Sequence, residues 1–516
     1  YRDGLPVQAQ APTVGYRALK FIRRHRTGVV AAALVALSLM TATVVAVRSA
    51  MITRAQAEQL RIESEKTEEV KDYIVGLFER ANPAYVRGRD LTPQDLLELG
   101  TEDIMADLGE QPEVRAEILA TIGMVFADLG EFEKARPLIE EAYDIREGLA
   151  GGRATEDLAE SLYQLGYIID ETGDSEAAVP YYERALEMQT TLHGEKSLQV
   201  ARTQNELGAA HFNLRDFERA RTLWTEALET RRALLGDEHI DIAETLANLA
   251  ALYTEDVFAQ VEGAFERAEE AHLESLGMAR ELEGDDHPLV ASNLYNLGTL
   301  LIDTGEPEEG LPYVEEALGI RRQVFGDRHD EVARAINYMG RAYHRMGELE
   351  RAQPLYEQSL DIHREVFGNA SRYVGIDLAQ LAALAEDRGN REDAVELYGE
   401  SISILASEEV NDGFRASRSR LALARILQDM GRHSEAGELA REALRVYTED
   451  FGWGDDDPDV NAARLALGRS LAETGPVDEA RSVLSAGLEF YRQNDDEATV
   501  SEIEALLSVL PAPASD

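Results

Sequence analysis

The sequence predicts an all-α protein, a right-handed α-α superhelix of stacked helical hairpins with one transmembrane helix near its N-terminus. Two observations lead to this prediction. A small residue follows a large apolar residue about once every 42 residues through most of the chain. In addition, residues 28–47 form a run of 20 residues without a charged side chain. The absence of cysteine excludes disulfide frameworks and thiolate metal sites.

The recurring small residue is a glycine or an alanine. It stands at Gly123, Gly166, Gly208, Ala250, Gly298, Gly340, Ala382, Ala424 and Gly468. Most repeats place a turn glycine seven residues later and another small residue five beyond that, as at Gly305 and Gly310. Glycine ends a helix in a left-handed conformation, and small residues let two helices approach closely. One hairpin cannot bury its apolar face alone, whereas stacked hairpins share a core, so we expect nine repeats.

The fourth repeat is six residues longer than its neighbours. Eighteen residues separate Ala250 from Ala268, where twelve separate Gly208 from Ala220. We expect the extra residues at the hairpin turn, within residues 254–263. Such an insertion is either a neutral loop or a partner-specific feature.

The uncharged run at residues 28–47 is long enough to span a bilayer. At ~1.5 Å per residue it reaches about 30 Å as a helix. Five basic residues lie within 15 residues before it and three within 15 after it, which predicts a cytoplasmic N-terminus and extracytoplasmic repeats. The expected parts are a cytoplasmic basic juxtamembrane tail (1–26), the transmembrane helix (27–48), a helical linker (49–110), nine repeats (111–493), and a capping helix with a frayed tail (494–516).

The charge of the chain is strongly acidic, with 51 Lys+Arg against 98 Asp+Glu. Residues 1–54 hold eight basic residues and one acid, so the excess of acid belongs to the rest. Such a surface repels phosphate backbones, and nucleic acid is not an expected partner. The acidity instead predicts a cationic or mixed-charge protein partner.

Several short patterns resemble functional sites but are better explained by structure. Asp450-Phe451-Gly452 spells a kinase metal-binding signature, yet no nucleotide loop or catalytic loop accompanies it, so we expect no catalysis and no cofactor. Three histidines recur one repeat apart, too far to share a metal, and are expected to be caps: His239, His287 and His329. A basic group in the sixth repeat is expected to pair with nearby acids: Arg341, His344 and Arg345.

The repeat pattern resembles the tetratricopeptide repeat, and its 42-residue period resembles the kinesin light chain variety. The segments between hairpins carry this resemblance, as in Gly284-Asp285-Asp286-His287-Pro288 and Phe325-Gly326-Asp327-Arg328-His329. Proline in the second helix, as at Pro137 and Pro312, fits the same variety. The resemblance implies a protein or peptide ligand on the concave face, which the first helices line.

Four first-helix asparagines are the candidate groove residues: Asn205, Asn248, Asn296 and Asn337. An amide offers a donor and an acceptor and can hold the backbone of an extended peptide. The resemblance implies this role. The alternative is that these amides bond to neighbouring helices.

A second resemblance lies before and after the apolar run. Residues 3–26, with Asp3-Gly4-Leu5-Pro6-Val7 and Lys20-Phe21-Ile22-Arg23-Arg24, look like the segment that joins the catalytic domain of bacterial transmembrane serine/threonine protein kinases to their membrane helix. Residues 70–83 resemble the segment that follows it. This implies a kinase domain before Tyr1, an inner-membrane location in bacteria, and a sensor or docking role for the repeats. The alternative is a free-standing membrane-anchored adaptor, and homo-oligomerisation is left open.

Overall fold

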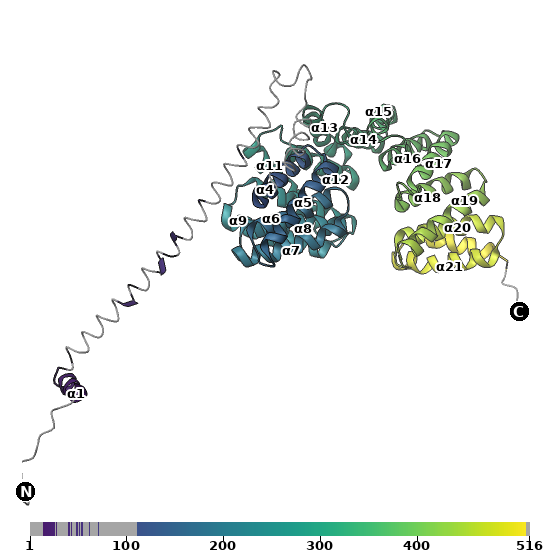
Figure 1. Ribbon diagram of the computed structural model, residues 1–516. Helices are drawn as coiled ribbons and strands as arrows, with labels where there is room; N and C mark the ends of the chain where they lie inside the picture. Colours follow the sequence, from purple (N-terminus) through teal and green to yellow (C-terminus); the bar gives the residue numbers. More distant parts are fainter. Residues whose placement is uncertain are drawn as a thin grey trace, which may run out of the picture. The chain divides into compact units, whose positions relative to one another are not determined.

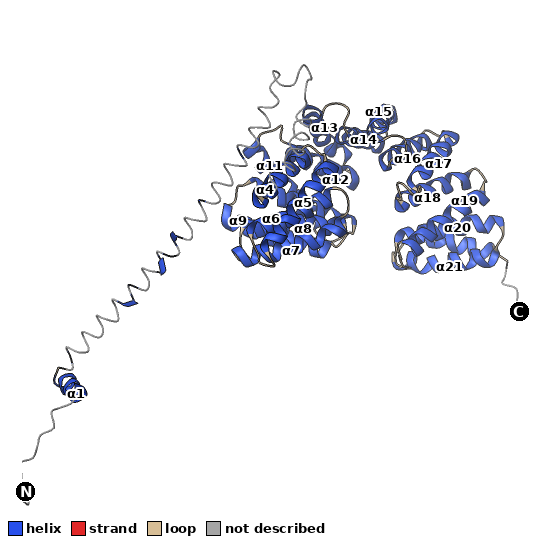
Figure 2. Ribbon diagram, viewed as in Figure 1, coloured by secondary structure: helices blue, strands red, loops and turns tan. Residues whose placement is uncertain are grey.

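The computed structural model describes residues 14–25 and 111–511, with isolated positions between 27 and 71. All regular secondary structure in this described part is helical (Figure 2). The chain divides into two compact units, residues 1–192 and residues 193–516, which are described separately. The all-helical solenoid predicted from the repeats is confirmed for the described residues.

In its described residues, the first unit contains one separate helix and two hairpins. Its helices are α1 (Val14–Arg24), α4 (Pro112–Asp128), α5 (Phe132–Ala150), α6 (Glu156–Glu171) and α7 (Ser175–His193). Helices α4 and α5 pack together as one hairpin, and α5 packs on α6 of the next.

The second unit contains seven hairpins and a final helix, which follow one another along the chain (Figure 1). Its helices are α8 (Leu198–Asn213), α9 (Phe217–Leu235), α10 (Ile240–Phe258), α11 (Ala264–Glu283), α12 (Pro288–Thr304), α13 (Pro307–Phe325), α14 (Asp330–Arg345), α15 (Leu349–Phe367), α16 (Arg372–Asp387), α17 (Arg391–Leu405), α18 (Gly413–Asp429), α19 (His433–Arg445), the π-helix η1 (Val446–Asp450), α20 (Pro458–Thr474), α21 (Val477–Gln493) and α22 (Glu497–Val509). Within each hairpin the two helices pack on each other, and each second helix packs on the following first helix.

Where the small residue of the first helix is a glycine, the second helix of the hairpin packs closely against it. A Cβ atom built on Gly298 would lie 2.7 Å from the Val314 side chain and 2.8 Å from the backbone oxygen of Gly310. At Gly208 it would lie 2.6 Å from the indole nitrogen of Trp224. A bulky side chain of the second helix therefore fills the space that the missing Cβ leaves.

The turns of the hairpins show the backbone conformation that the glycines predict. Gly305 closes α12 with φ of 105°. In the third hairpin Arg215 takes the same place with φ of 62°, a conformation that is unfavourable for a residue with a side chain. The N-terminal ends are also as expected for the three histidines: each caps its helix, as when the Nδ1 atom of His287 accepts the backbone N–H of Leu289 at 3.2 Å.

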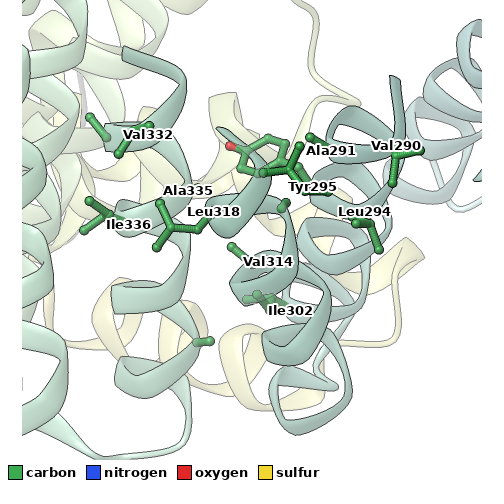
Figure 3. Packing of buried hydrophobic residues seen from close by; sticks show 14 of the residues in the cluster. Val290, Ala291, Leu294, Tyr295, Ile302, Val314, Leu318, Val332, Ala335 and Ile336 are labelled. Atoms are coloured by element: carbon green, nitrogen blue, oxygen red, sulfur yellow. The ribbon is translucent and has the colours of Figure 1, made fainter. Parts of the chain in front are cut away.

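A core cluster of buried residues lies mainly across α12, α13 and α14, and Figure 3 shows it from close by. Ile302, Val314 and Ile336 are fully buried in it. Because the first helices α10 to α20 each contact their own hairpin partner and the second helix of the preceding repeat, the clusters follow the repeats and stabilise the spacing between first helices.

The fourth-repeat insertion differs from the expectation. Residues 254–258 are helical and belong to α10, which they extend by three residues beyond the usual end, and only residues 259–263 form the turn. The sequence alone did not reveal this because Thr-Glu-Asp-Val-Phe carries no strong helix or turn signal.

The prediction of a membrane-spanning helix, and with it the inner-membrane location, is wrong. Among the residues that the structure describes, no helix combines the length and the apolar character that a bilayer crossing needs. Helix α1 has only 11 residues, and the long helices carry charged faces, as α10 does with Asp241 and Glu255. Most of residues 27–48 and of the expected linker 49–110 lie outside the described residues.

The close approach at Gly298 generates a stability prediction. Replacing Gly298 with Ala should lower the free energy of unfolding by about 1–3 kcal/mol, because the added Cβ overlaps the second helix. Gly319 in α13 is the matched control, since a Cβ there meets no atom within 4 Å. The change Gly319→Ala should raise stability by about 0.5–1 kcal/mol, because helical glycine costs backbone entropy. Urea unfolding measures both, and a neutral Gly298→Ala would contradict the packing described.

Candidate peptide-binding groove

The second unit has a groove on its first helices, with a cavity volume of about 810 Å³. Four successive first helices, α12, α14, α16 and α18, supply most of its walls, and the end of α10 adds Thr254 and Phe258. The groove lies on these helices because the second helices occupy their other side within each hairpin. This is the face on which the repeat pattern predicts ligand binding.

The lining of the groove is basic, in contrast to the chain as a whole. Five arginines contribute to it: Arg334, Arg341, Arg372, Arg415 and Arg418. The only carboxylates in the lining are Asp303 and Asp377, whereas the whole chain has a formal net charge of −47. Total charge therefore gives the wrong sign for this surface.

Asp303 pairs with two arginines of the basic group that the sequence predicts in the sixth repeat. Its Oδ1 atom lies 2.8 Å from Arg341 and 3.9 Å from Arg345, and burial raises the pKa of this carboxyl. His344 lies 2.8 Å from Asp387. The expectation that these three basic side chains pair with nearby acids is confirmed.

At the α16–α18 end, one buried carboxylate holds two arginines. Asp412 caps α18 and lies 3.2 Å from the Arg372 guanidinium and 2.8 Å from that of Arg415. Arg418, one turn further along α18, lies 5.7 Å from the centre of the Phe414 ring. It is exposed and makes no ion pair within the described part of the chain, and its positive charge acts over a longer distance on the carboxyl groups of Asp303 and Asp459.

A buried polar cluster supports the middle of the groove. The Oδ1 atom of Asp377 accepts hydrogen bonds from Asn337 at 2.7 Å and from Ser359 at 3.0 Å, and its Oδ2 atom lies 2.6 Å from Nδ1 of His363. Burial raises the pKa of the Asp377 carboxyl, and these hydrogen bonds oppose the shift. The cluster joins α14, α15 and α16, so it fixes one first helix relative to the next.

The structure separates the four candidate asparagines into two groups. Asn296 and Asn337 both line the groove, but Asn205 and Asn248 do not. The latter two bond to each other, with Asn248 donating to Asn205 at 3.2 Å. Asn337 donates its amide to Asp377, so only the Asn296 side chain makes no hydrogen bond within the described residues. Of the five groove arginines, sequence reasoning singled out only Arg341, although Arg334 and Arg418 hold the same register position, six residues before the small residue.

No cluster of potential metal ligands occurs among the described residues. The Asp-Phe-Gly motif begins at the last residue of η1, Asp450, which lies 2.9 Å from Arg445, and Gly452 has φ of 69°. It therefore forms part of a connection between hairpins.

Comparisons with known proteins agree with the hairpin architecture. Tetratricopeptide repeat models match residues 114–191, 199–256, 257–323, 290–365 and 331–407, and a second such model matches residues 421–495. No curated protein matches the chain.

Solved structures of repeat proteins are also similar, and kinesin light chain-like proteins are among them. BtubC (BKLC) from P. vanneervenii is 26% identical, with 45% of this chain and 90% of that chain covered and a TM-score of 0.36. A Podospora anserina protein with nearly identical kinesin light chain TPR-like repeats is 21% identical, covering 40% and 98%, with a TM-score of 0.34.

The quorum sensor NprR from B. thuringiensis, in its apo form, is 15% identical, with 75% of this chain and 99% of that chain covered and a TM-score of 0.55. This likeness shows a shared fold. Because the family models match more than half of its length, the chain belongs to the tetratricopeptide repeat family and is a protein-interaction scaffold of that kind.

Proposed function

We propose that the chain binds an extended, anionic segment of a partner protein in the groove on α12, α14, α16 and α18. The observation that carries this proposal is the basic lining of the groove within a strongly acidic chain. Charges are screened over about 8 Å at physiological ionic strength. A ligand inside the groove therefore interacts mainly with the charges of the lining. We accordingly propose an anionic partner in place of the cationic one that the total charge predicts.

The arrangement of the arginines supports a carboxylate-bearing ligand. Guanidinium groups hold carboxylates through two parallel hydrogen bonds, which fixes orientation as well as charge. Arg418 is exposed without an ion pair in the described part, and Arg372 and Arg415 share the single carboxylate of Asp412. The arginines at this end of the groove therefore outnumber the carboxylates that pair with them, which leaves positive charge for a ligand.

The asparagines have unequal roles in this proposal. Asn296 is half-buried in the groove wall, and its amide is free to bond to a peptide backbone. Asn337 uses its amide N–H to hold Asp377, so its side-chain oxygen is the group left for a ligand. Asn205 and Asn248 bond to each other and do not line the groove, so the proposal assigns them to contacts between neighbouring helices and not to the ligand.

The more specific expectation from the sequence, that the repeats are the docking region of a serine/threonine protein kinase, stays a prediction. It rests on residues 3–26 and 70–83 and on none of the groove contacts. The coding sequence upstream of Tyr1 tests it: a kinase domain there supports the docking role, and its absence favours a free-standing adaptor.

The basic groove predicts a charge preference. A fluorescein-labelled nine-residue peptide of alternating glutamate and serine should bind the 516-residue chain in fluorescence anisotropy, while the lysine–serine peptide should not. The change Arg418→Glu should weaken binding about tenfold, since loss of one favourable contact plus one repulsion costs about 1.4 kcal/mol. Arg219→Glu is the matched control, at an exposed position of α9 outside the groove. Equal effects of the two changes, or tighter binding of the lysine peptide, would contradict the proposal.

Replacing the two groove asparagines should have different effects on stability and on peptide binding. Asn337→Ala should lower the free energy of unfolding by about 1–3 kcal/mol, because it removes a donor from a buried carboxylate. Asn296→Ala should change stability by less than about 0.5 kcal/mol and weaken binding of the glutamate–serine peptide by about 0.5–1.5 kcal/mol. Unfolding and anisotropy titrations measure the two quantities separately. An Asn296→Ala variant that binds as the parent does would remove Asn296 from the site.

A further inference from the structure

The fourth-repeat insertion gives α10 a length that other first helices do not have. Helix α10 ends at Phe258, eight residues after its small residue Ala250. Helices α8, α14, α16 and α18 each end five residues after theirs. Three of the six extra residues therefore lengthen the helix by most of a turn, and the others lie in the longer connection and at the start of α11.

Ion pairs from two neighbouring helices hold this extra turn in place. Asp256 has a mostly buried side chain, and its two carboxylate oxygens accept hydrogen bonds from Arg221 of α9 at 2.9 and 3.0 Å. Arg267 of α11 approaches the same carboxylate at 3.9 Å. Both guanidinium groups also lie over the Tyr253 ring, at 5.8 and 5.5 Å from its centre. A neutral surface loop would not require such a set of contacts.

The extra turn presents an aromatic ring to the groove. Phe258 and Thr254 line the cavity, and Phe258 is 52% exposed. The groove residues that α12 contributes include polar side chains, Asn296, Thr299 and Asp303. Exposure alone is not informative, because Phe325 is 42% exposed outside the groove. Other aromatic rings also line the groove, at Tyr295, Tyr338, Tyr373, Tyr398 and Phe414, but these are buried or half-buried, and what distinguishes Phe258 is that its ring is exposed.

We propose that the extra turn of α10 is a specificity-determining wall of the groove, in which Phe258 packs against one apolar side chain of the bound anionic segment. This inference rests on the proposed function and adds to it the register of the ligand. Burying an apolar side chain against an aromatic ring makes binding more favourable, because apolar surface is removed from water. The basic α16–α18 end would hold the ligand's carboxylates, and the α10 end its apolar residue.

The test uses the labelled glutamate–serine peptide and a series in which a single leucine replaces each serine in turn. With the parent chain, leucine at one position near one end should tighten binding about three- to tenfold, and leucine elsewhere should have little effect. In Phe258→Ser the gain should disappear, whereas Phe258→Leu should retain part of it. Phe325→Ser removes another exposed ring, which lies outside the groove, and should keep the full gain. Circular dichroism confirms that each variant is folded.

The outcomes distinguish a failure of the Phe258 inference from a failure of the proposed function on which it rests. If the glutamate–serine peptide does not bind the parent chain, the proposed function fails and the inference falls with it. If that peptide binds and depends on Arg418, but no leucine position tightens binding, the inference alone is overturned. It is also overturned if the leucine gain survives in Phe258→Ser or is lost equally in Phe325→Ser.

Discussion

The structure depends on the close approach of the two helices in each hairpin. At Gly298 and Gly208 the space of a missing Cβ is occupied by Val314 and Trp224 from the second helix. This contact sets the distance between the helices and therefore which residues of the first helix remain for the groove. Where the fourth repeat has Ala250, the buried ring of His272 takes the register position of Trp224, and burial lowers the pKa of its imidazole to about 4. The site is thus filled by an uncharged ring at neutral pH.

Stacking of the hairpins places the exposed sides of successive first helices next to one another, and together they form the groove. Each first helix packs on its own partner and on the preceding second helix, which leaves one strip of side chains facing the groove. Buried polar groups control the spacing between strips, as when Asp377 links α16 to Asn337 and His363. A carboxylate in such a place is destabilising unless its hydrogen bonds are complete, so the cluster ties groove geometry to folding.

Much of this fold follows from sequence because its determinants are local. The small residues, the turn glycines and the capping histidines each act within one repeat, so a 42-residue comparison reveals them. The groove was harder to predict because it depends on which charges of several repeats face the same side. Total acidity concealed the arginines, and amide chemistry alone did not show that Asn205 and Asn248 bond to each other. The uncharged run at residues 28–47 predicted a membrane helix from composition, which the described helices do not include.

The central claim is that an anionic segment lies against the first helices. Site-specific photo-crosslinking tests it most directly, with benzoylphenylalanine incorporated in place of Asn296 in the groove or of Glu438 on α19 outside it. On irradiation with the labelled glutamate–serine peptide, the account predicts a crosslink from position 296, suppressed by excess unlabelled peptide, and little from position 438. A crosslink of equal or greater yield at position 438, or none at position 296 while the peptide is bound, would contradict it.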